Sequence, residues 1–267
     1  MTADFTHFTL DVIDGVADVR VGAEDGSSRM NGTSTSELVR LAELLARDPD
    51  VRVIVLRPRG RDFSEGGDIT MFGQMLDQGL GDGLRPMIDS FHQALELLAR
   101  LDVPIVAAVR GAVAGGGLGL VCVADVVIAA DDAVVTTGAT GVGLTADGGI
   151  TWYLPRLLGL RRAQELLLMN RRLSGEEALE WGLVTRVAAA DAVDDIALDT
   201  ARQLSTGPTF AYGRLRALLL ASFETPLGTQ LSRECEAMVS AADSEATTNR
   251  IASFLNRTLH PRSGPAS

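Results

Sequence analysis

The sequence predicts an α/β protein in which a core of alternating strands and helices precedes a helical C-terminal part. Segments with strand periodicity alternate with segments with helix periodicity in the first half of the chain, and helical patterns dominate after Asp147. Such alternation implies crossover units in which helices pack on a sheet. The length of 267 residues, 46% of them hydrophobic, is sufficient for one large domain with a substantial core.

The chain begins with a predicted hairpin. Apolar and polar residues alternate with a period of two over residues 8–12 and 16–21, and Asp14-Gly15 between them is a turn signal. Four further segments follow in alternation, distinguished by helical spacing of leucines or by short apolar runs. They are a helix over 34–47, a strand over 51–56 that ends before Pro58, a helix over 87–100 and a strand over 103–109.

The second half is predicted to be mostly helical, with one strand. The expected helices are 150–158, 161–169, 175–181, 190–204, 208–222 and 226–255, and the strand is 183–187. We therefore divide the chain near residue 200 into an α/β core, 1–200, and a C-terminal helical region, 201–267.

Composition excludes several classes of function. A net charge of −11 argues against nucleic acid as a partner, because phosphate binding needs a basic surface. All 24 basic residues are arginine, so neither a lysine Schiff base nor a Walker P-loop is available. Two distant cysteines and three histidines in no ligand spacing predict no metal site.

Hydropathy gives no indication of a membrane protein. The longest apolar stretch, residues 104–130, contains Arg110 and Asp125, which a membrane span would not carry, so it is interpreted as buried core. The N-terminus lacks the apolar run of a signal peptide. We therefore expect no membrane partner and a cytoplasmic location.

Two glycine-rich turns and one aspartate are the candidates for chemistry. Residues 63–68 and 111–119 each follow a strand and precede a helical segment, so their N–H groups could converge as an oxyanion hole, or their glycines could serve only tight packing. Neither turn fits G-x-G-x-x-G, and no G-x-S-x-G elbow occurs. Asp147, before Gly148-Gly149, is by local pattern a turn residue or helix N-cap.

Four motifs together resemble the crotonase superfamily, the enoyl-CoA hydratase/isomerase family. They are Phe63-Ser64-Glu65-Gly66-Gly67-Asp68-Ile69; residues 104–119 (PIVAAVRGAVAGGGLG) with Ala124-Asp125; Leu154-Pro155-Arg156-Leu157-Leu158-Gly159; and residues 173–184 (LSGEEALEWGLV). The resemblance spans about residues 8–257. It implies repeated β-β-α units, an acyl-coenzyme A thioester substrate, and a helical C-terminal region that forms a homotrimer or a hexamer of two trimers.

The resemblance also implies where the substrate binds. The backbone N–H groups of Gly67 and Gly116 would hold the thioester oxygen, which stabilises an enolate. Residues 71–84 would shape the acyl pocket, and Arg59 and Arg61 would pair with coenzyme A phosphates. The remaining substrate-binding candidates are Phe63, Glu65, Gly66, Asp68, Ile69, His92, Ala139 and Trp152. Glu65 could equally point to solvent, and His92 could equally be an ordinary helix residue.

The reaction depends on the acid–base residues. The two glutamates of the family's hydratases are replaced here by Gly119 and Ala139, neither of which can transfer a proton. Asp147 aligns with the single base of isomerases, closest to the phenylacetate-pathway branch, and with the nucleophile of 4-chlorobenzoyl-CoA dehalogenase, in which His92 would align with the water-activating histidine. Ala139 replaces a tryptophan of that dehalogenase.

We therefore predict an enoyl-CoA isomerase-type enzyme in which Asp147 moves a proton, provided that burial raises its pKa. No metal or redox cofactor is needed beyond the coenzyme A of the substrate. The alternatives are a hydratase, a thioester hydrolase, a coenzyme A-binding protein without catalysis, and a purely structural oligomer.

Overall fold

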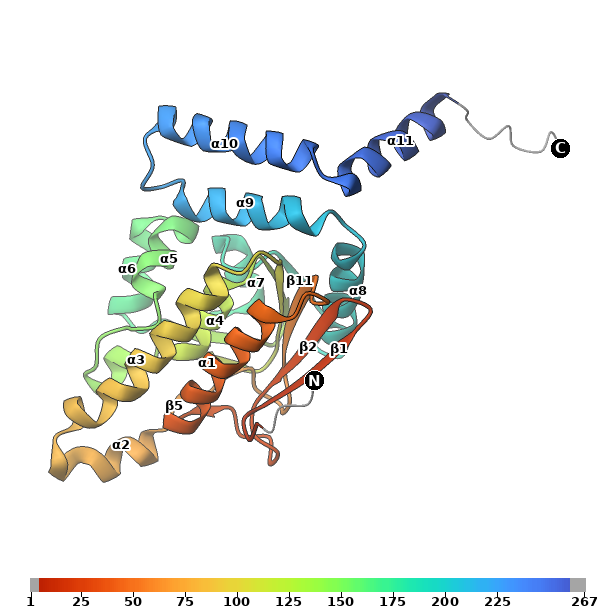
Figure 1. Ribbon diagram of the computed structural model, residues 1–267. Coiled ribbons are helices and arrows are strands. Elements are labelled where there is room, and N and C mark those ends of the chain that lie inside the picture. The colour runs from red at the N-terminus through yellow and green to blue at the C-terminus, as the bar shows by residue number, and fades with distance from the viewer. Residues whose placement is uncertain (1–4, 260–267) are drawn as a thin grey trace.

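A computed structural model describes residues 5–259, and Figure 1 shows its helices and strands. The strands are β1 (Phe8–Ile13), β2 (Val16–Val21), β3 (Arg29–Met30), β4 (Val53–Pro58), β5 (Gly66–Gly67), β6 (Ile105–Val109), β7 (Ala112–Ala114), β8 (Val126–Ala130), β9 (Val134–Thr136), β10 (Leu173–Ser174) and β11 (Arg186–Ala188). The helices are α1 (Gly32–Arg47), α2 (Ile69–Met75), α3 (Leu80–Ala99), α4 (Gly116–Val123), α5 (Ile150–Leu158), α6 (Leu160–Leu168), α7 (Gly175–Trp181), α8 (Val193–Ser205), α9 (Thr209–Ala221), α10 (Leu227–Ala242) and α11 (Glu245–Leu259), with 3₁₀ turns at Leu76–Gln78 and Ala139–Val142.

The strands form a six-stranded sheet in the order β1-β2-β4-β6-β8-β11, which is parallel except for the β1–β2 hairpin. The short strands form two smaller sheets, β10-β9-β7 and β3-β5. A strand of the large sheet, then a short strand, then a helix recurs as β2-β3-α1, β4-β5-α2 and β6-β7-α4. These are the β-β-α units that the resemblance implied.

The hairpin forms where the period-two alternation predicts it. Ile13 pairs with Val16 across the turn, and the two turn residues, Asp14 and Gly15, have φ values of 51° and 80°. A two-residue hairpin turn favours such left-handed residues, because they match the twist of the strands.

Helices cover the large sheet. α1 contacts α3, α3 contacts α4, and α8 contacts β4, β6 and β8. α9 and α10 lie side by side at one end of the core, and α11 projects away from it (Figure 1). The core comprises apolar residues from the sheet, the helices packed on it and the segment before β5, including fully buried Ile54, Leu118 and Phe63.

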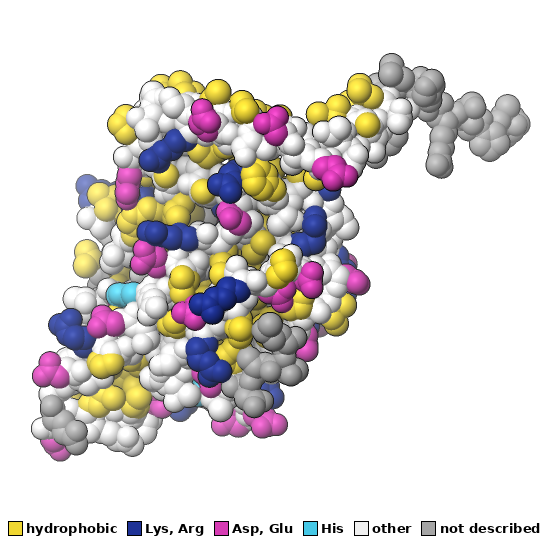
Figure 2. Space-filling model, in the orientation of Figure 1, with side chains coloured by type: hydrophobic (Ala, Val, Ile, Leu, Met, Phe, Trp, Pro, Cys, Tyr) yellow, Lys and Arg dark blue, Asp and Glu magenta, His cyan; other side chains and the backbone are white. Residues whose placement is uncertain are grey.

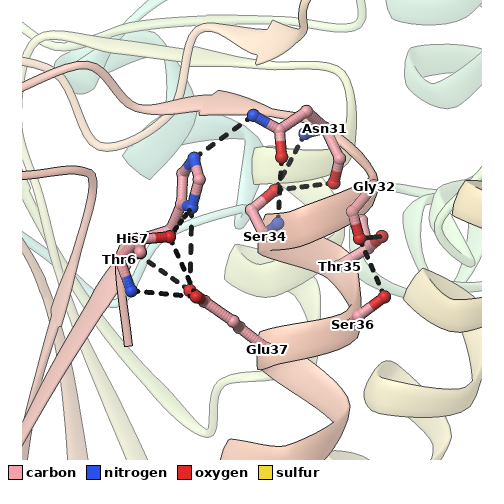
Figure 3. A network of polar contacts seen from close by, with 8 residues as sticks. All are labelled: Thr6, His7, Asn31, Gly32, Ser34, Thr35, Ser36 and Glu37. Atoms are coloured by element: carbon pink, nitrogen blue, oxygen red, sulfur yellow. Dashed lines mark hydrogen bonds and ion pairs between the residues drawn. The ribbon is translucent and has the colours of Figure 1, made fainter. Parts of the chain in front are cut away.

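A polar network joins the N-terminal segment to α1, and Figure 3 shows it at close range. Both carboxylate oxygens of buried Glu37 accept backbone N–H groups, from Thr6 and His7, each at 2.9 Å. Asn31 caps α1: its side chain accepts from Ser34 N, and the Ser34 hydroxyl accepts from Asn31 N. The network stabilises the start of α1 and the end of β3 immediately before it.

Two predicted boundaries were wrong because of prolines. α3 begins at Leu80, seven positions before the predicted 87, although Pro86 lies inside it; Pro86 is exposed, so water can satisfy the carbonyl that lacks a helical partner. β4 continues through Pro58, because pairing with β6 stops at Leu56 and the missing N–H of Pro58 breaks no bond on that side.

Two further boundaries differ in the second half. The predicted helix over 226–255 is two helices, because α10 ends at Ala242 and the Ser244 hydroxyl accepts from Thr247 N to begin α11. The strand predicted over 183–187 is β11, shifted toward the C-terminus, because buried Leu183 and Val184 pack at the end of α7 instead.

Candidate active site

An apolar cavity of about 310 Å³ lies where the glycine-rich turns meet α2 and α3. Seven of the residues predicted from the sequence line it: Glu65, Gly66, Gly67, Ile69, Gly116, Ala139 and Asp147. Segments far apart in the chain therefore bring the two proposed oxyanion donors and the proposed base to one space. Glu65 lines the cavity and also pairs with Arg29, on the exposed side, at 3.4 Å.

The two glycine-rich turns are held together by backbone hydrogen bonds. Ser64 N donates to Ala112 O at 3.0 Å, and Ser64 O accepts from Ala114 N at 2.8 Å. This pairing brings Gly115 so close to Gly66 that a Cβ at position 115 would lie 3.5 Å from Gly66 Cα. Gly66 and Gly115 have φ values of 83° and 50°, which favour glycine. The left-handed backbone therefore favours glycine at both positions, and at Gly66 the approach of Ala114 O, 3.2 Å from a Cβ position, favours it further.

Both proposed oxyanion donors have N–H groups available to a ligand. Gly116 is the first residue of α4, and the N–H groups of a first helical turn have no partner within the helix. In the loop after β5, it is Asp68 N, and not Gly67 N, that donates to Met30 O. Because Gly67 and Gly116 line the same cavity, they are suited to hold one oxygen between them.

Asp147 is a half-buried carboxyl group whose pKa is shifted upward. Its side chain is half-buried, 38% exposed, and lines the cavity. Burial raises the pKa of Asp147, and the charge of nearby His92 opposes that rise only in part. The direction of the shift is the one that the mechanism inferred from the sequence requires.

His92 lies behind Asp147, outside the residues that line the cavity. Its Nε2 is 4.0 Å from Asp147 Oδ2 and accepts a hydrogen bond from Gly148 N at 3.1 Å. Through this hydrogen bond the imidazole can hold the backbone beside Asp147 in place.

Three other predicted residues do not line the cavity. Phe63 is fully buried in the core. The Asp68 carboxylate caps α2 by accepting from two N–H groups of its first turn. The Trp152 indole donates to Glu224 Oε1 at 3.1 Å and packs against Arg156, whose guanidinium carbon is 3.8 Å from the ring centre. Each of the three therefore has a structural contact that accounts for its position.

The two arginines predicted to contact coenzyme A lie away from this cavity. Arg61 lines a second cavity of about 420 Å³, which also contains Arg110 and the carboxylates of Asp132, Asp191 and Asp194. Arg59 is half-buried near Gly22, where a Cβ on the glycine would lie 3.6 Å from Arg59 Cβ. Phosphate binding by Arg59 and Arg61 stays a prediction.

The sequence identified only part of the apolar lining of the cavity, because the expected segment, residues 71–84, contributes Phe72 and Leu84 but not the other apolar side chains. The apolar side chains of the proposed acyl side are Met30, Phe72, Leu84, Met87, Ile88, Phe91, Val142 and Leu144. Residues 71–84 were expected to shape the pocket, but the underestimated length of α3 concealed that Leu84 belongs to the same apolar helix face as Phe91.

Among residues 5–259, no group of three or more His, Cys, Asp or Glu side chains is arranged to hold a metal ion. Within that same range, no helix is long and apolar enough to cross a membrane.

Comparison with known proteins identifies the family of this chain. The family model for enoyl-CoA hydratase/isomerase matches residues 14–261. The chain belongs to this family. It is 28% identical to a protein named 4-chlorobenzoyl coenzyme A dehalogenase-1 from an Arthrobacter species, over 95% of this chain and 92% of that protein.

Two further relatives show the breadth of the family. The chain is 31% identical to 1,2-epoxyphenylacetyl-CoA isomerase of Escherichia coli, over 90% of this chain and 92% of that enzyme. Its fold matches the crystal structure of a putative enoyl-CoA hydratase/isomerase from Mycobacterium abscessus with a TM-score of 0.90 at 31% identity, covering 94% and 96% of the two chains. Both the acyl-CoA substrate class and the fold, with its helical C-terminal region, follow from family membership.

Proposed function

We propose that this family member catalyses double-bond or ring isomerisation of an acyl-CoA thioester by transferring a proton through Asp147. The N–H groups of Gly67 and Gly116 hold the thioester oxygen as it becomes an enolate. Asp147 removes a proton from the acyl chain and returns it at another carbon. The reaction therefore consumes no water and needs no second carboxylate.

The observation that supports this proposal best is the composition of the cavity. Asp147 has a raised pKa and lines the same cavity as both glycines, and the hydratase glutamates are replaced by Gly119 and Ala139. A single base with a pKa closer to neutrality suits proton transfer in both directions.

The test is deuterium exchange on a panel of acyl- and enoyl-CoA thioesters, followed by mass spectrometry, with Asp147→Asn beside the wild type. The isostere keeps size and hydrogen bonding but cannot act as a base, so exchange and double-bond migration should fall by about 10²–10⁴-fold. Exchange that survives in Asp147→Asn rejects Asp147 as the base. Binding without exchange in the wild type favours a coenzyme A-binding protein without catalysis.

A second candidate reaction is displacement of a leaving group by Asp147 as nucleophile, followed by hydrolysis. The 4.0 Å separation between His92 Nε2 and Asp147 Oδ2 favours it, because a nearby histidine can activate water. Against it, the lone pair of that nitrogen is already bonded to Gly148 N. Incubation with 4-chlorobenzoyl-CoA in ¹⁸O-water tests this candidate: chloride release with label entering Asp147 supports displacement, and the absence of both rejects displacement on this substrate.

We also infer that the chain assembles as a homotrimer or hexamer in the cytoplasm, with no cofactor except the coenzyme A of its substrate. The support is a set of exposed apolar side chains on α10 and α11, a region where Figure 2 shows hydrophobic atoms gathered: Leu227, Leu231, Met238, Val239, Ile251, Phe254 and Leu255. Burial of such a surface between copies removes it from water. Light scattering on the purified protein tests this, and a monomer at micromolar concentration would reject it.

A further inference from the structure

The turn that contains Asp147 is held by two helices. Gly148 and Gly149 both have left-handed φ values, 64° and 74°. The N–H group of Gly148 donates to His92 Nε2 on α3 at 3.1 Å. Its carbonyl oxygen packs on α4, directly over Gly119. The backbone immediately after Asp147 is therefore in contact with one helix through its N–H group and with the other through its carbonyl.

The contact on α4 leaves no room for a side chain at position 119. A Cβ on Gly119 would lie 2.6 Å from Gly148 O and 3.3 Å from Leu95 Cδ1. The first distance is shorter than a carbon–oxygen contact can be, and a backbone oxygen cannot rotate away as a flexible side chain can. Any residue larger than glycine at 119 must therefore displace the turn.

The same helix provides one of the proposed oxyanion donors. Gly116 begins α4, and Gly119 follows three positions later, so the two lie on one face of the helix. The distance between the enolate oxygen and the base is thus determined by one rigid helical turn. Catalysis by proton transfer depends steeply on such distances.

We propose that Gly119 and His92 are positioning residues for Asp147, which hold its turn at a set place relative to the Gly116 N–H group. This rests on the proposed role of Asp147 as the base. It follows that a carboxylate side chain at position 119 and the present Asp147 turn exclude each other, so the chain cannot regain a second acidic group there by a single substitution.

Gly119→Ala tests the contact on α4. Alanine favours a helix over glycine, so a loss reports on the contact with Gly148 O and not on helix propensity. We expect kcat to fall about 100-fold, as for a displacement of about 1 Å, while KM stays close to the wild-type value because Gly116 is unchanged. Gly228→Ala, at an exposed helical glycine with no atom near its Cβ position, is the matched control and should leave kcat unchanged.

His92 variants test the other contact without adding volume. His92→Ala removes the acceptor for Gly148 N and should lower kcat, whereas His92→Gln offers an amide oxygen as acceptor and should restore most of it. Because both changes act through one turn, Gly119→Ala combined with His92→Ala should lose less than the sum of the two effects. Additive losses, or equal losses in the Ala and Gln variants, would overturn the proposal.

A readout without turnover separates this inference from the proposed function. The titration of Asp147 is followed by carbon NMR of labelled carboxyl groups, assigned with Asp147→Asn. In Gly119→Ala the carboxyl group should move toward water and its pKa should fall toward the ordinary value. If the wild type exchanges no substrate protons, the proposed function fails while this titration still decides the positioning. An unchanged titration in a folded Gly119→Ala protein contradicts the positioning itself.

Discussion

The two sides of the cavity differ in how tightly their glycines are packed. On one side, the packed wall (residues 64–67, 113–119 and 147–149), a Cβ on Gly66 would lie 3.2 Å from a backbone oxygen, and one on Gly119 would lie 2.6 Å from another. On the other side, the open wall (residues 69–84), Gly73 and Gly81 have no atom within 4 Å of that position, and a Cβ on Gly83 would meet only the flexible side chain of Met75, at 2.8 Å. The proposed catalytic groups are therefore held by backbone contacts, whereas the proposed acyl side is less constrained.

The largest effect is expected from adding a methyl group to the packed wall at Gly66. This residue has a φ of 83°, and its Cβ would meet Ala114 O. Gly66→Ala should displace the Gly67 N–H group and lower kcat by about 10²–10³-fold, as the loss of one oxyanion donor does. Steady-state kinetics on the substrate found in the exchange panel measures this. A fully active Gly66→Ala enzyme would show that the packed wall can accommodate a side chain at position 66.

The next effect concerns the polar network around Glu37, which joins the N-terminal segment to α1. Glu37 is 8% exposed, and although burial alone would raise its pKa, hydrogen bonds from Thr6 and His7 lower it overall. A group with a lowered folded-state pKa adds stability above its unfolded pKa, about 4.3, and loses it as pH falls through the folded value. Glu37→Gln should therefore cost about 1.5–3 kcal/mol at pH 7 and less at more acidic pH.

Urea denaturation at neutral and acidic pH measures this difference. Glu43→Gln on the same helix removes an exposed partner of Arg47 and is the control, with an expected change of at most about 0.5 kcal/mol. A Glu37→Gln difference that grows toward acidic pH would contradict the assigned sign.

A smaller effect is expected from the charge beside Asp147. Activity requires the ionised carboxylate, so kcat should rise with pH through the raised pKa of Asp147. The His92 charge lowers that pKa, so His92→Gln should move the acidic limb to higher pH by a fraction of a unit, with the plateau retained. A pH–rate profile measures it, and a limb that moves to lower pH would exclude an electrostatic effect of His92 on Asp147.

The sequence predicted some elements of the fold and of the candidate site accurately and missed others. The boundaries of α5 and α7 agree to the residue, because apolar spacing is strong there and α7 has a Ser174–Glu177 capping box. Gly67, Gly116 and Asp147 followed from motif resemblance. β3 and β5 were missed, because strands of two residues have no detectable periodicity. The contact between Gly148 and Gly119 was equally invisible, since only packing brings α4 beneath that turn.

The smallest expected effect is on the free energy of unfolding, and its sign on the open wall is opposite to that on the packed wall. Gly73 lies within α2, is exposed and has nothing near its Cβ position, so alanine there restricts the unfolded chain without a clash. Gly73→Ala should raise the free energy of unfolding by about 0.4–1 kcal/mol, whereas Gly66→Ala should lower it. Paired urea denaturation curves measure both. If both substitutions destabilise, α2 is packed more tightly than the open wall implies, and the acyl side is then held as firmly as the side that performs the chemistry.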